Sequence, residues 1–392
     1  MKRTDILIVG GGVIGSAVAW WLKGAKGSDA RVTVLEPDVT YERGSTGRSL
    51  GSIRQQFSTP ENILISRFGI DFIRRSGEIL EVDGERPDVQ FRPGHYLFLA
   101  TGRGAETLAE NVRVQRETGA DITLMTPAEL SERLPWIRND DIAAAAIGER
   151  DEGWLDPYAL LRAFRAAAIR AGVVYLQDRA VGLVREVNRI VGVELADGGK
   201  LAAGHVVNAA GPWAGDLAAT ADIDLPVRPR KRTVFRVTTP EPPQDPVLIV
   251  DPSGVYVRPE GDGFLAGSSP LAGDTDPDTF DLDPVYTQFD DICWPALAHR
   301  VPAFERLKMA GAWAGLYAVN TFDHNAVLGP HPEIGNLYFA NGFTGHGLQQ
   351  SPAVGRALAE WILDGASTSL NLDRFRFDRI AANRPIVERG VI

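Results

Sequence analysis

Residues 5–16 of the sequence read DILIVGGGVIGS, and this stretch decides the fold of the N-terminal region. It begins with a short apolar, β-branched strand of the kind that is buried in a parallel sheet. A glycine-rich turn follows, residues 16–23 read as a helix, and residues 31–35 (RVTVL) read as a second strand. The sequence therefore predicts a complete strand–turn–helix–strand unit within about 30 residues.

The glycine turn has the spacing Gly10-x-Gly12-x-x-Gly15, which is typical of dinucleotide-binding turns. Gly10 permits the tight turn, Gly12 lets the backbone approach a pyrophosphate, and Gly15 lets the helix pack closely on the sheet. The helix N-terminus presents free N–H groups and a partial positive charge to the phosphates. Glu36 ends the second strand, where a carboxylate accepts hydrogen bonds from ribose hydroxyls. A chance glycine turn is the alternative, but this combination favours binding of an adenine dinucleotide.

Three later segments favour FAD over NAD. Residues 43–48 (RGSTGR) can donate N–H groups and hydroxyls to phosphate and the ribityl chain, although a surface turn is the alternative. Residues 208–213 (NAAGPW) end a strand beside the nucleotide. Residues 342–347 (GFTGHG) lie between strand 337–340 and helix 352–363, so they would set amides beside the flavin's pyrimidine edge. A single NAD site needs no such C-terminal loop.

The predicted FAD contacts extend from these turns to neighbouring small residues. In addition to Gly10, Gly12, Gly15 and Glu36, they are Val13, Ile14, Ser45, Thr46, Gly47, Arg48, Ser49, Ala180, Val181, Ala209, Ala210, Gly211, Trp213, Gly315, Gly342, Phe343, Thr344, Gly345, His346, Gly347, Leu348 and Gln349.

Composition excludes several other classes of protein. The formal net charge of -10 disfavours nucleic-acid binding, and the basic run at 228–232 (RPRKR) is too short to reverse it. Cys293 is the only cysteine, so no internal disulfide forms and a reducing, cytoplasmic location is expected, with peripheral membrane association as the alternative. Residues 6–22 are uncharged but contain four glycines, so we expect neither a transmembrane segment nor a signal peptide. The six histidines are scattered, and no metal site is predicted.

The length of 392 residues predicts two domains. The fold class is α/β, with a Rossmann-like FAD-binding domain interleaved with an antiparallel-sheet substrate domain. Residues 89–100 look like a hairpin that opens the second domain. Both domains are expected to be discontinuous: residues 1–85, 140–220 and 306–392 form the FAD-binding domain, and residues 86–139 and 221–305 form the substrate-binding domain.

Further motifs lie along the whole chain. They are residues 51–58 (GSIRQQFS), 300–305 (RVPAFE), 312–315 (AWAG), 320–323 (NTFD), 329–332 (GPHP) and 342–350 (GFTGHGLQQ). With them the chain resembles the D-amino-acid-oxidase-like flavoprotein superfamily, which includes sarcosine oxidases, dimethylglycine dehydrogenase, glycine oxidase and D-arginine dehydrogenase. Within this superfamily it is similar to the mitochondrial FAD-dependent oxidoreductase-domain proteins that are linked to assembly of respiratory complex I.

The resemblance implies five catalytic or substrate-binding residues. Arg54 would clamp a substrate carboxylate, because guanidinium and carboxylate pair in a bidentate manner. A surface arginine or a domain-interface ion pair is the alternative. Tyr256, Arg232 and Gln349 are counterparts of substrate residues in the D-arginine-dehydrogenase pattern, and Tyr256 could instead be a half-buried core tyrosine. His346 lies in the late glycine turn and is expected near the flavin ring.

Departures from the family pattern modify these expectations. Gly315 stands where monomeric sarcosine oxidase has its linking cysteine, and Gly47 and Arg48 stand where dimethylglycine dehydrogenase has a tryptophan and a linking histidine, so non-covalent FAD is predicted. Leu265, or a neighbour in 263–267, replaces the lysine that promotes reaction with oxygen. Gln349 replaces the carboxylate-binding lysine of the sarcosine group, which argues against sarcosine itself.

The function predicted from the sequence is an FAD-dependent oxidoreductase that oxidises the C–N bond of a small amino acid or N-alkylated amino acid by hydride transfer. A dehydrogenase is favoured over an oxidase, with a quinone or an electron-transfer protein as acceptor in place of O2. The alternatives are a flavin-binding assembly or scaffold protein for a respiratory complex, and a 2-hydroxy acid dehydrogenase on the same fold.

Overall fold

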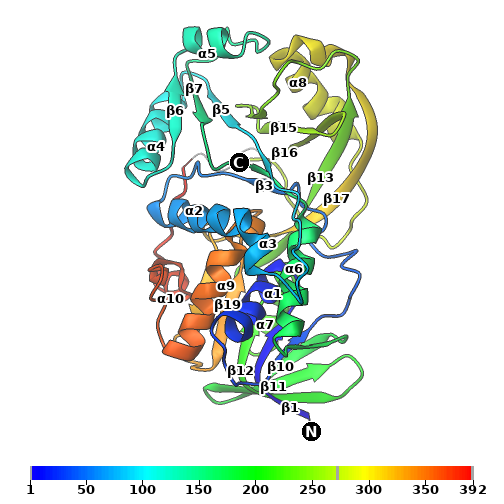
Figure 1. Ribbon diagram of the computed structural model, residues 1–392, viewed down its shortest axis with the longest axis vertical. Helices are drawn as coiled ribbons and strands as arrows, with labels where there is room; N and C mark the ends of the chain where they lie inside the picture. Colours follow the sequence, from blue (N-terminus) through cyan, green and yellow to red (C-terminus); the bar gives the residue numbers. More distant parts are fainter. Residues whose placement is uncertain (1, 271–272, 390–392) are drawn as a thin grey trace.

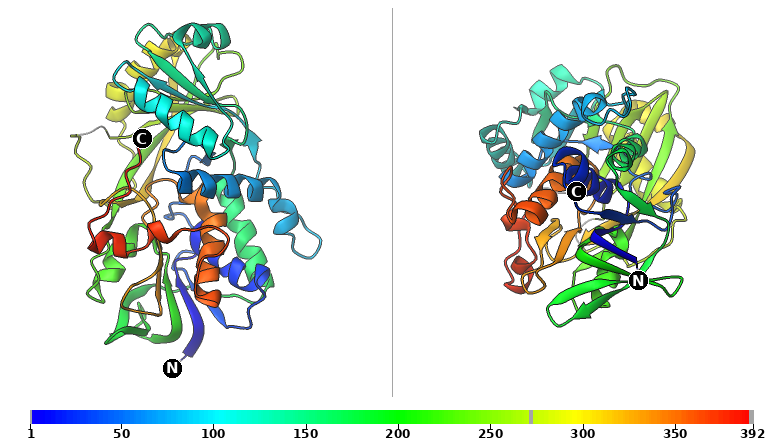
Figure 2. Two further views of the ribbon diagram at one scale, coloured as in Figure 1. Left: turned by 90° about the vertical axis from the view of Figure 1, so that its left-hand side faces the viewer. Right: turned by 60° about the horizontal axis from the view of Figure 1, so that its bottom comes forward.

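The computed structural model describes residues 2–270 and 273–389, and within them the strands form two eight-stranded sheets and one three-stranded sheet. Figure 1 shows the first sheet in the lower half of the molecule with helices α1, α6 and α9 beside it, and the second sheet in the upper half with α4, α5 and α8. The two further views in Figure 2 show the same division.

The first sheet is built on the N-terminal strand, which lies between two parallel neighbours. Its path runs β10–β11–β12–β1–β2–β9, and β19 pairs with β12 and with β18. Val9 pairs with Asn208 on one side and with Leu35 on the other, so the glycine turn starts at the carboxyl edge of a parallel core. The strands are β1 (Lys2–Val9), β2 (Val32–Leu35), β9 (Val174–Leu176), β10 (Ala180–Glu186), β11 (Arg189–Leu195), β12 (Lys200–Asn208), β18 (Val327–Pro330) and β19 (Leu337–Asn341).

Apolar helices cover one face of this sheet. Helix α1 (Val13–Trp20) is buried at nearly every position, and it packs with α6 (Pro157–Arg170) and α9 (Gly347–Asp364) in one hydrophobic core. Helix α7 (Ala214–Ala219) packs on the opposite face in a second core. The predicted strand–turn–helix–strand unit is therefore confirmed, although the helix starts three residues earlier than the sequence predicted, at Val13.

The second sheet is mixed, whereas the sequence predicted an antiparallel one. Its order is β17–β13–β16–β15–β14–β5–β7–β6, and the pair β5–β14 is parallel. The strands are β5 (Tyr96–Ala100), β6 (Ile122–Met125), β7 (Ala144–Gly148), β13 (Val227–Thr238), β14 (Leu248–Val250), β15 (Val255–Glu260), β16 (Gly263–Ser268) and β17 (Lys308–Asn320). Strands β7 and β17 belong to this sheet although the predicted boundaries place them in the FAD-binding domain; the domain division stays a proposal.

The predicted hairpin at residues 89–100 is wrong. Strand β4 (Arg92–Pro93) pairs with β8 (Gly153–Trp154), which also pairs with β3 (Ser52–Ile53), in the three-stranded sheet. Strand β5 lies in the second sheet instead. Pro93 cannot donate a backbone hydrogen bond to a ladder, which favours a two-residue edge strand.

Two helices differ from their predicted bounds. Helix α9 begins at Gly347 and contains Pro352, where the sequence predicted the helix to start. Pro352 has no N–H that could donate to the Leu348 carbonyl, so this carbonyl accepts from Ser351 Oγ at 2.8 Å. The predicted helix at 62–80 is divided at Arg75. The remaining α-helices are α2 (Pro60–Arg74), α3 (Ser76–Ile79), α4 (Ala105–Glu117), α5 (Pro127–Arg133), α8 (Trp294–Arg300) and α10 (Asp378–Ala381).

Helix α2 crosses α9 between the two halves of the molecule (Figure 1). A Cβ at Gly69 would lie 2.3 Å from the Gln349 carbonyl oxygen, so this glycine lets the two backbones approach. Among the described residues, no helix is long and apolar enough to cross a membrane.

Candidate functional site

At two positions of the early glycine turn, the backbone packs too closely for any residue that has a Cβ. Gly10 has φ of 101°, and a Cβ there would lie 2.3 Å from the Ala209 carbonyl oxygen. A Cβ at Gly15 would lie 1.9 Å from the Gly10 carbonyl oxygen. Gly12 differs, because the nearest atom to its added Cβ is Thr46 Oγ1 at 3.4 Å. The space above Gly12 is therefore open to a ligand at the start of α1.

Glu36 lies beside this turn. Its carboxylate accepts from the Gly11 N–H at 2.8 Å and from the Asp38 N–H at 3.0 Å. Burial raises the pKa of Glu36, and the two backbone N–H groups oppose that shift. The strand end, the turn and the carboxylate thus meet at one point, as the sequence predicted.

A cavity of about 2010 Å³ opens along these elements. Most of the predicted cofactor contacts line it: Gly10, Gly12, Val13, Ile14, Glu36, Ser45, Thr46, Arg48, Ser49, Ala180, Val181, Ala209, Ala210, Gly211, Trp213, Gly315, Phe343, Thr344, Gly345, Gly347 and Leu348. Gly15, Gly47, Gly342, His346 and Gln349 are absent from the lining. Gly15 packs on Gly10 instead.

The cavity has lining residues that the sequence did not single out. Tyr41 contributes a buried hydroxyl to the cavity. Neither this hydroxyl nor Ser45 Oγ has a hydrogen-bond partner in the described part of the chain. Asp38 and Tyr317 also line the cavity, as does Arg43 from the predicted loop at 43–48. Unpaired buried polar atoms are costly, so these groups fit a site whose occupant carries hydroxyls or phosphates.

A second cavity of about 720 Å³ adjoins the first. Ser49, Tyr317, Thr344 and Gly345 line both, so the two are contiguous. The second cavity is also lined by Leu50, Ser52, Arg54, Tyr96, Leu248, Val250, Tyr256, Ser269, His346 and Gln349. Of the predicted catalytic residues, Arg54, Tyr256, His346 and Gln349 therefore come together here.

Arg54 is the one cationic side chain among the described residues that line the second cavity, and it is buried. Its guanidinium carbon lies 4.8 Å from the Phe57 ring centroid and 5.3 Å from that of Phe98. One terminal nitrogen lies 3.0 Å from His346 Nε2. Burial and the nearby Arg54 charge lower the pKa of His346 to about 3, so the imidazole is neutral and Nε2 accepts from Arg54.

Gln349 and Tyr256 complete this wall. Gln349 Oε1 accepts from the Arg54 backbone N–H at 2.8 Å, which orients the segment that carries the guanidinium. A Cβ at Gly267 would lie 2.4 Å from the Tyr256 hydroxyl oxygen, so this glycine makes room for the ring. Burial raises the pKa of Tyr256 well above its usual value, and the phenol stays protonated.

Arg232 lies outside the described lining of both cavities. Its guanidinium forms a bidentate ion pair with Asp276, with both distances 2.8 Å. It also lies 5.4 Å from the ring centroid of Tyr317, which does line both cavities. Arg232 therefore packs against the Tyr317 ring, and its guanidinium is paired with Asp276.

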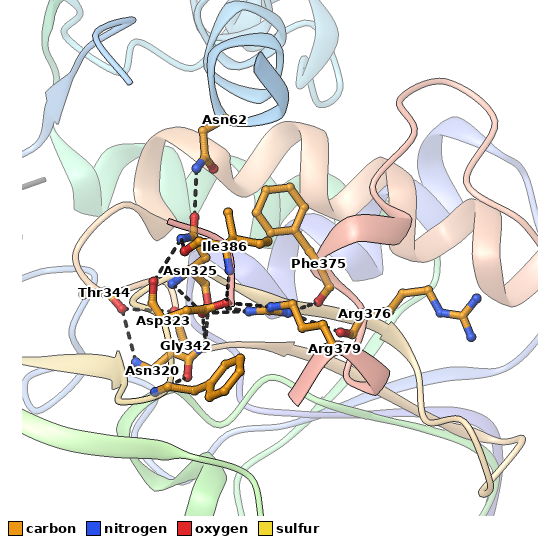
Figure 3. A network of polar contacts seen from close by, with 11 residues as sticks. Asn62, Asn320, Asp323, Asn325, Gly342, Thr344, Phe375, Arg376, Arg379 and Ile386 are labelled. Carbon is orange, nitrogen blue, oxygen red and sulfur yellow. Dashed lines mark hydrogen bonds and ion pairs between the residues drawn. The ribbon is translucent and has the colours of Figure 1, made fainter. Parts of the chain in front are cut away.

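A buried polar network fixes the late glycine turn. Thr344 has φ of 49° and accepts through Oγ1 from the Asn320 N–H at 3.2 Å. Asn320 Nδ2 in turn donates to Asp323 Oδ1 at 2.8 Å, and Asp323 pairs with Arg379 at 2.8 Å (Figure 3). The C-terminal segment joins through the Ile386 N–H, which donates to Asp323 at 3.0 Å. The turn is thus set by residues from two distant parts of the chain.

Comparison with known proteins identifies this arrangement. The family model described as "FAD dependent oxidoreductase" (DAO) matches residues 5–361. The chain belongs to the DAO family of FAD-dependent oxidoreductases. It is 43% identical over 429 aligned positions to "FAD-dependent oxidoreductase domain-containing protein 1" of Xenopus laevis, with 100% of this chain and 85% of that protein covered.

Two more distant relatives share the fold and carry named activities. Glycine oxidase of Geobacillus kaustophilus is 27% identical over 383 residues, covering 96% of this chain and 97% of that one. The crystal structure of L-proline dehydrogenase from P. horikoshii has a TM-score of 0.85 and 27% identity, covering 98% of this chain and 100% of that one. The predicted superfamily, fold class and FAD cofactor are confirmed.

The large cavity of this DAO-family chain fits FAD. The open space at Gly12, the Glu36 carboxylate and the unpaired Tyr41 hydroxyl suit the nucleotide part, and the late glycine turn lies where the two cavities meet. Gly315 lines the cavity at the position where a cysteine would be needed for a thiol link to FAD. The single cysteine, Cys293, is buried in the core of the second sheet, where burial raises the pKa of its thiol to about 11.

Proposed function

We propose that this DAO-family chain oxidises the C–N bond of a small amino acid or N-alkylated amino acid whose carboxylate pairs with Arg54. One observation carries the proposal: the buried Arg54 guanidinium has no carboxylate partner in the described part of the chain and lines a cavity contiguous with that for FAD. A buried guanidinium that no carboxylate contacts directly is costly, so it argues for an anionic ligand.

Arg54 is prepared for this role by its surroundings. Phe57 and Phe98 lie against the guanidinium, and His346 accepts one of its N–H groups. Nε has no hydrogen-bond partner among the residues that the structure describes. Such a fork can bind a carboxylate in a bidentate manner and fix the α-carbon. Bound FAD supplies the chemistry by accepting a hydride at its N5 atom.

The rest of the cavity is apolar or phenolic. Tyr96, Tyr256 and Tyr317 contribute rings, and Leu248 and Val250 contribute aliphatic wall. Within the described lining there is no carboxylate to pair with an ammonium group. This composition supports an amine that binds deprotonated, with its nitrogen lone pair free to assist hydride loss, and it argues against substrates with a second charged group.

The electron acceptor is inferred from the residue at position 265. Leu265 has no charge that could stabilise developing superoxide. It is buried on β16 and is absent from the described lining of both cavities. This supports a dehydrogenase that passes electrons to a quinone or an electron-transfer protein. The cytoplasmic location stays a prediction.

An anaerobic substrate screen tests the function. The FAD-loaded protein is mixed with glycine, sarcosine, L- and D-proline and further amino acids, and bleaching of the flavin absorbance is followed in a stopped-flow instrument. At least one of these compounds should reduce the flavin. Replacing Arg54 by lysine keeps the charge but removes the fork, and loss of about 2 kcal/mol should slow reduction at low substrate concentration roughly 30-fold.

The control is Arg113→Lys, because Arg113 is exposed on α4 and pairs with Glu110 and Glu117 at the surface. It should reduce its flavin at the wild-type rate. No reduction by any amine would favour an assembly or scaffold role in which FAD is structural. Reduction by 2-hydroxy acids alone would move the assignment to a hydroxy acid dehydrogenase.

A further inference from the structure

A buried carboxylate lies behind the substrate cavity, and the function proposed above gives it no role. Glu152 is 1% exposed. It accepts from the Gln55 N–H at 2.9 Å, from the Tyr96 N–H at 3.1 Å and from Gln56 Nε2 at 3.2 and 3.3 Å. A Cβ at Gly148 would lie 1.9 Å from Glu152 Oε2, so the chain leaves space there for this carboxylate.

Glu152 connects the two walls that carry the clamp. Gln55 and Gln56 follow Arg54 directly, and Tyr96 begins β5. Arg54 and Tyr96 both line the substrate cavity. The carboxylate therefore positions both segments through their backbone N–H groups without lining the cavity itself.

Glu152 is an acidic group that interacts electrostatically with Arg54. Arg54 carries a buried positive charge, and its direct polar partner, His346, is neutral. Burial raises the pKa of Glu152 to about 7, while the hydrogen bonds from Gln55, Tyr96 and Gln56 and the Arg54 charge oppose the rise. An anion placed on Arg54 would cancel that charge and favour the protonated carboxyl.

We propose that Glu152 is the counter-charge of Arg54 in the free site and takes up a proton when a ligand carboxylate reaches Arg54. This inference rests on the proposed function, since it assumes a substrate with a carboxylate. Glu152 is a positioning residue, because it acts through Arg54 and the backbone around it. In the liganded site the substrate carboxylate becomes the partner of Arg54, and the buried region keeps a constant charge.

The uptake fits the acid–base chemistry of an amino acid. In water the substrate is a zwitterion, and its ammonium group must lose one proton before the nitrogen lone pair is available. The N–H proton leaves to water, and one proton from water joins the Glu152 carboxylate. Binding of the reactive form then occurs with little net release of protons at neutral pH.

Other groups around Glu152 do not account for such uptake. Burial raises the pKa of Tyr96 to about 12, and the pKa of His346 is near 3, so neither titrates near neutrality. Arg258 also lies near Tyr96; burial lowers its pKa, and its ordinary value lies far above neutrality. His95 is a further ionisable neighbour, with Nδ1 2.7 Å from the Gly148 carbonyl, and it is tested separately by substitution.

Calorimetric titration with benzoate tests the proposal. Benzoate has a carboxylate but no amine, and perturbation of the flavin spectrum reports its binding beside the cofactor. Titrations of the FAD-loaded protein at about pH 7.5 in buffers of different ionisation enthalpy give the number of protons exchanged. We expect uptake of roughly half a proton or more per benzoate, and an affinity that falls as the pH rises above about 7. Benzyl alcohol, which lacks the carboxylate, should give no uptake.

Variants assign the proton. Glu152→Gln should bind benzoate with almost no proton uptake and with a flat pH dependence, whereas the control His95→Gln should behave as wild type. Wild-type benzoate binding without uptake would overturn the inference, whatever the stability of the variants. Uptake that persists in Glu152→Gln would also overturn it. Absence of benzoate binding, or binding unchanged in Arg54→Lys, would overturn the clamp itself and the inference with it.

Discussion

The glycine turn allows a test that separates folding from cofactor binding. In Gly15→Ala the new Cβ would lie 1.9 Å from the Gly10 carbonyl oxygen, a backbone atom that no rotamer change can move. Strand β1 and helix α1 must separate, and overpacking of this kind costs about 3 kcal/mol. For a chain of 392 residues this lowers the melting temperature by roughly 4 °C.

Gly12→Ala is the matched variant. Its Cβ would meet only Thr46 Oγ1 at 3.4 Å, an ordinary contact, so the melting temperature of the FAD-free protein should hardly change. The methyl group would instead occupy the space of the pyrophosphate and cost about 1–3 kcal/mol of binding, which weakens FAD affinity roughly 5- to 150-fold. Thermal unfolding of the FAD-free protein and titration of flavin fluorescence measure the two effects. Wild-type FAD affinity in Gly12→Ala would refute the assignment of the phosphates to the start of α1.

Three further outcomes are expected. Denaturing electrophoresis should leave no yellow protein band, because Gly315 offers no thiol at the cavity and Cys293 lies in another core. Flavin reduced by substrate should reoxidise slowly in air and rapidly with an artificial quinone; fast reoxidation by air alone would contradict the dehydrogenase assignment. Burial alone would raise the pKa of Glu360, but hydrogen bonds from Ser369, Arg356 and Thr368 lower it to about 2. The Glu360 carboxylate therefore contributes on the order of 2 kcal/mol to the free energy of unfolding above about pH 4.5, and this contribution is lost as the pH falls towards 2. Wild type and Glu360→Gln should accordingly differ less in urea unfolding at pH 3 than at pH 6.

Local sequence was sufficient for the cofactor turn. The apolar strand, the glycine spacing and Glu36 lie within about 30 residues, so nearby residues are enough to recognise the unit. The late turn at 342–347 was also recognisable, because a strand precedes it and a helix follows. The helix after the early turn starts three residues before its predicted position, and the helix after the late turn starts five residues before it.

Contacts between distant segments could not be predicted in this way. Asp276 lies 44 residues from Arg232, and no local pattern indicates that the pair occupies the guanidinium. Strand β4 pairs with β8 some 60 residues later, which is why the hairpin prediction failed. Glu152 follows an ordinary charged turn, and only its burial against Gln55 and Tyr96 distinguishes it from a surface carboxylate.

The C-terminal segment also bears on how the protein can be handled in the laboratory. Glu388 accepts hydrogen bonds from the Ser58 N–H, from Thr59 and from Asn62, a few residues beyond Arg54, while Ile386 is tied to Asp323. Trimming the protein before residue 385, or fusing a bulky tag there, would release the segment that follows the guanidinium but leave the early glycine turn intact. Such a preparation would still be yellow, yet it would be a poor catalyst.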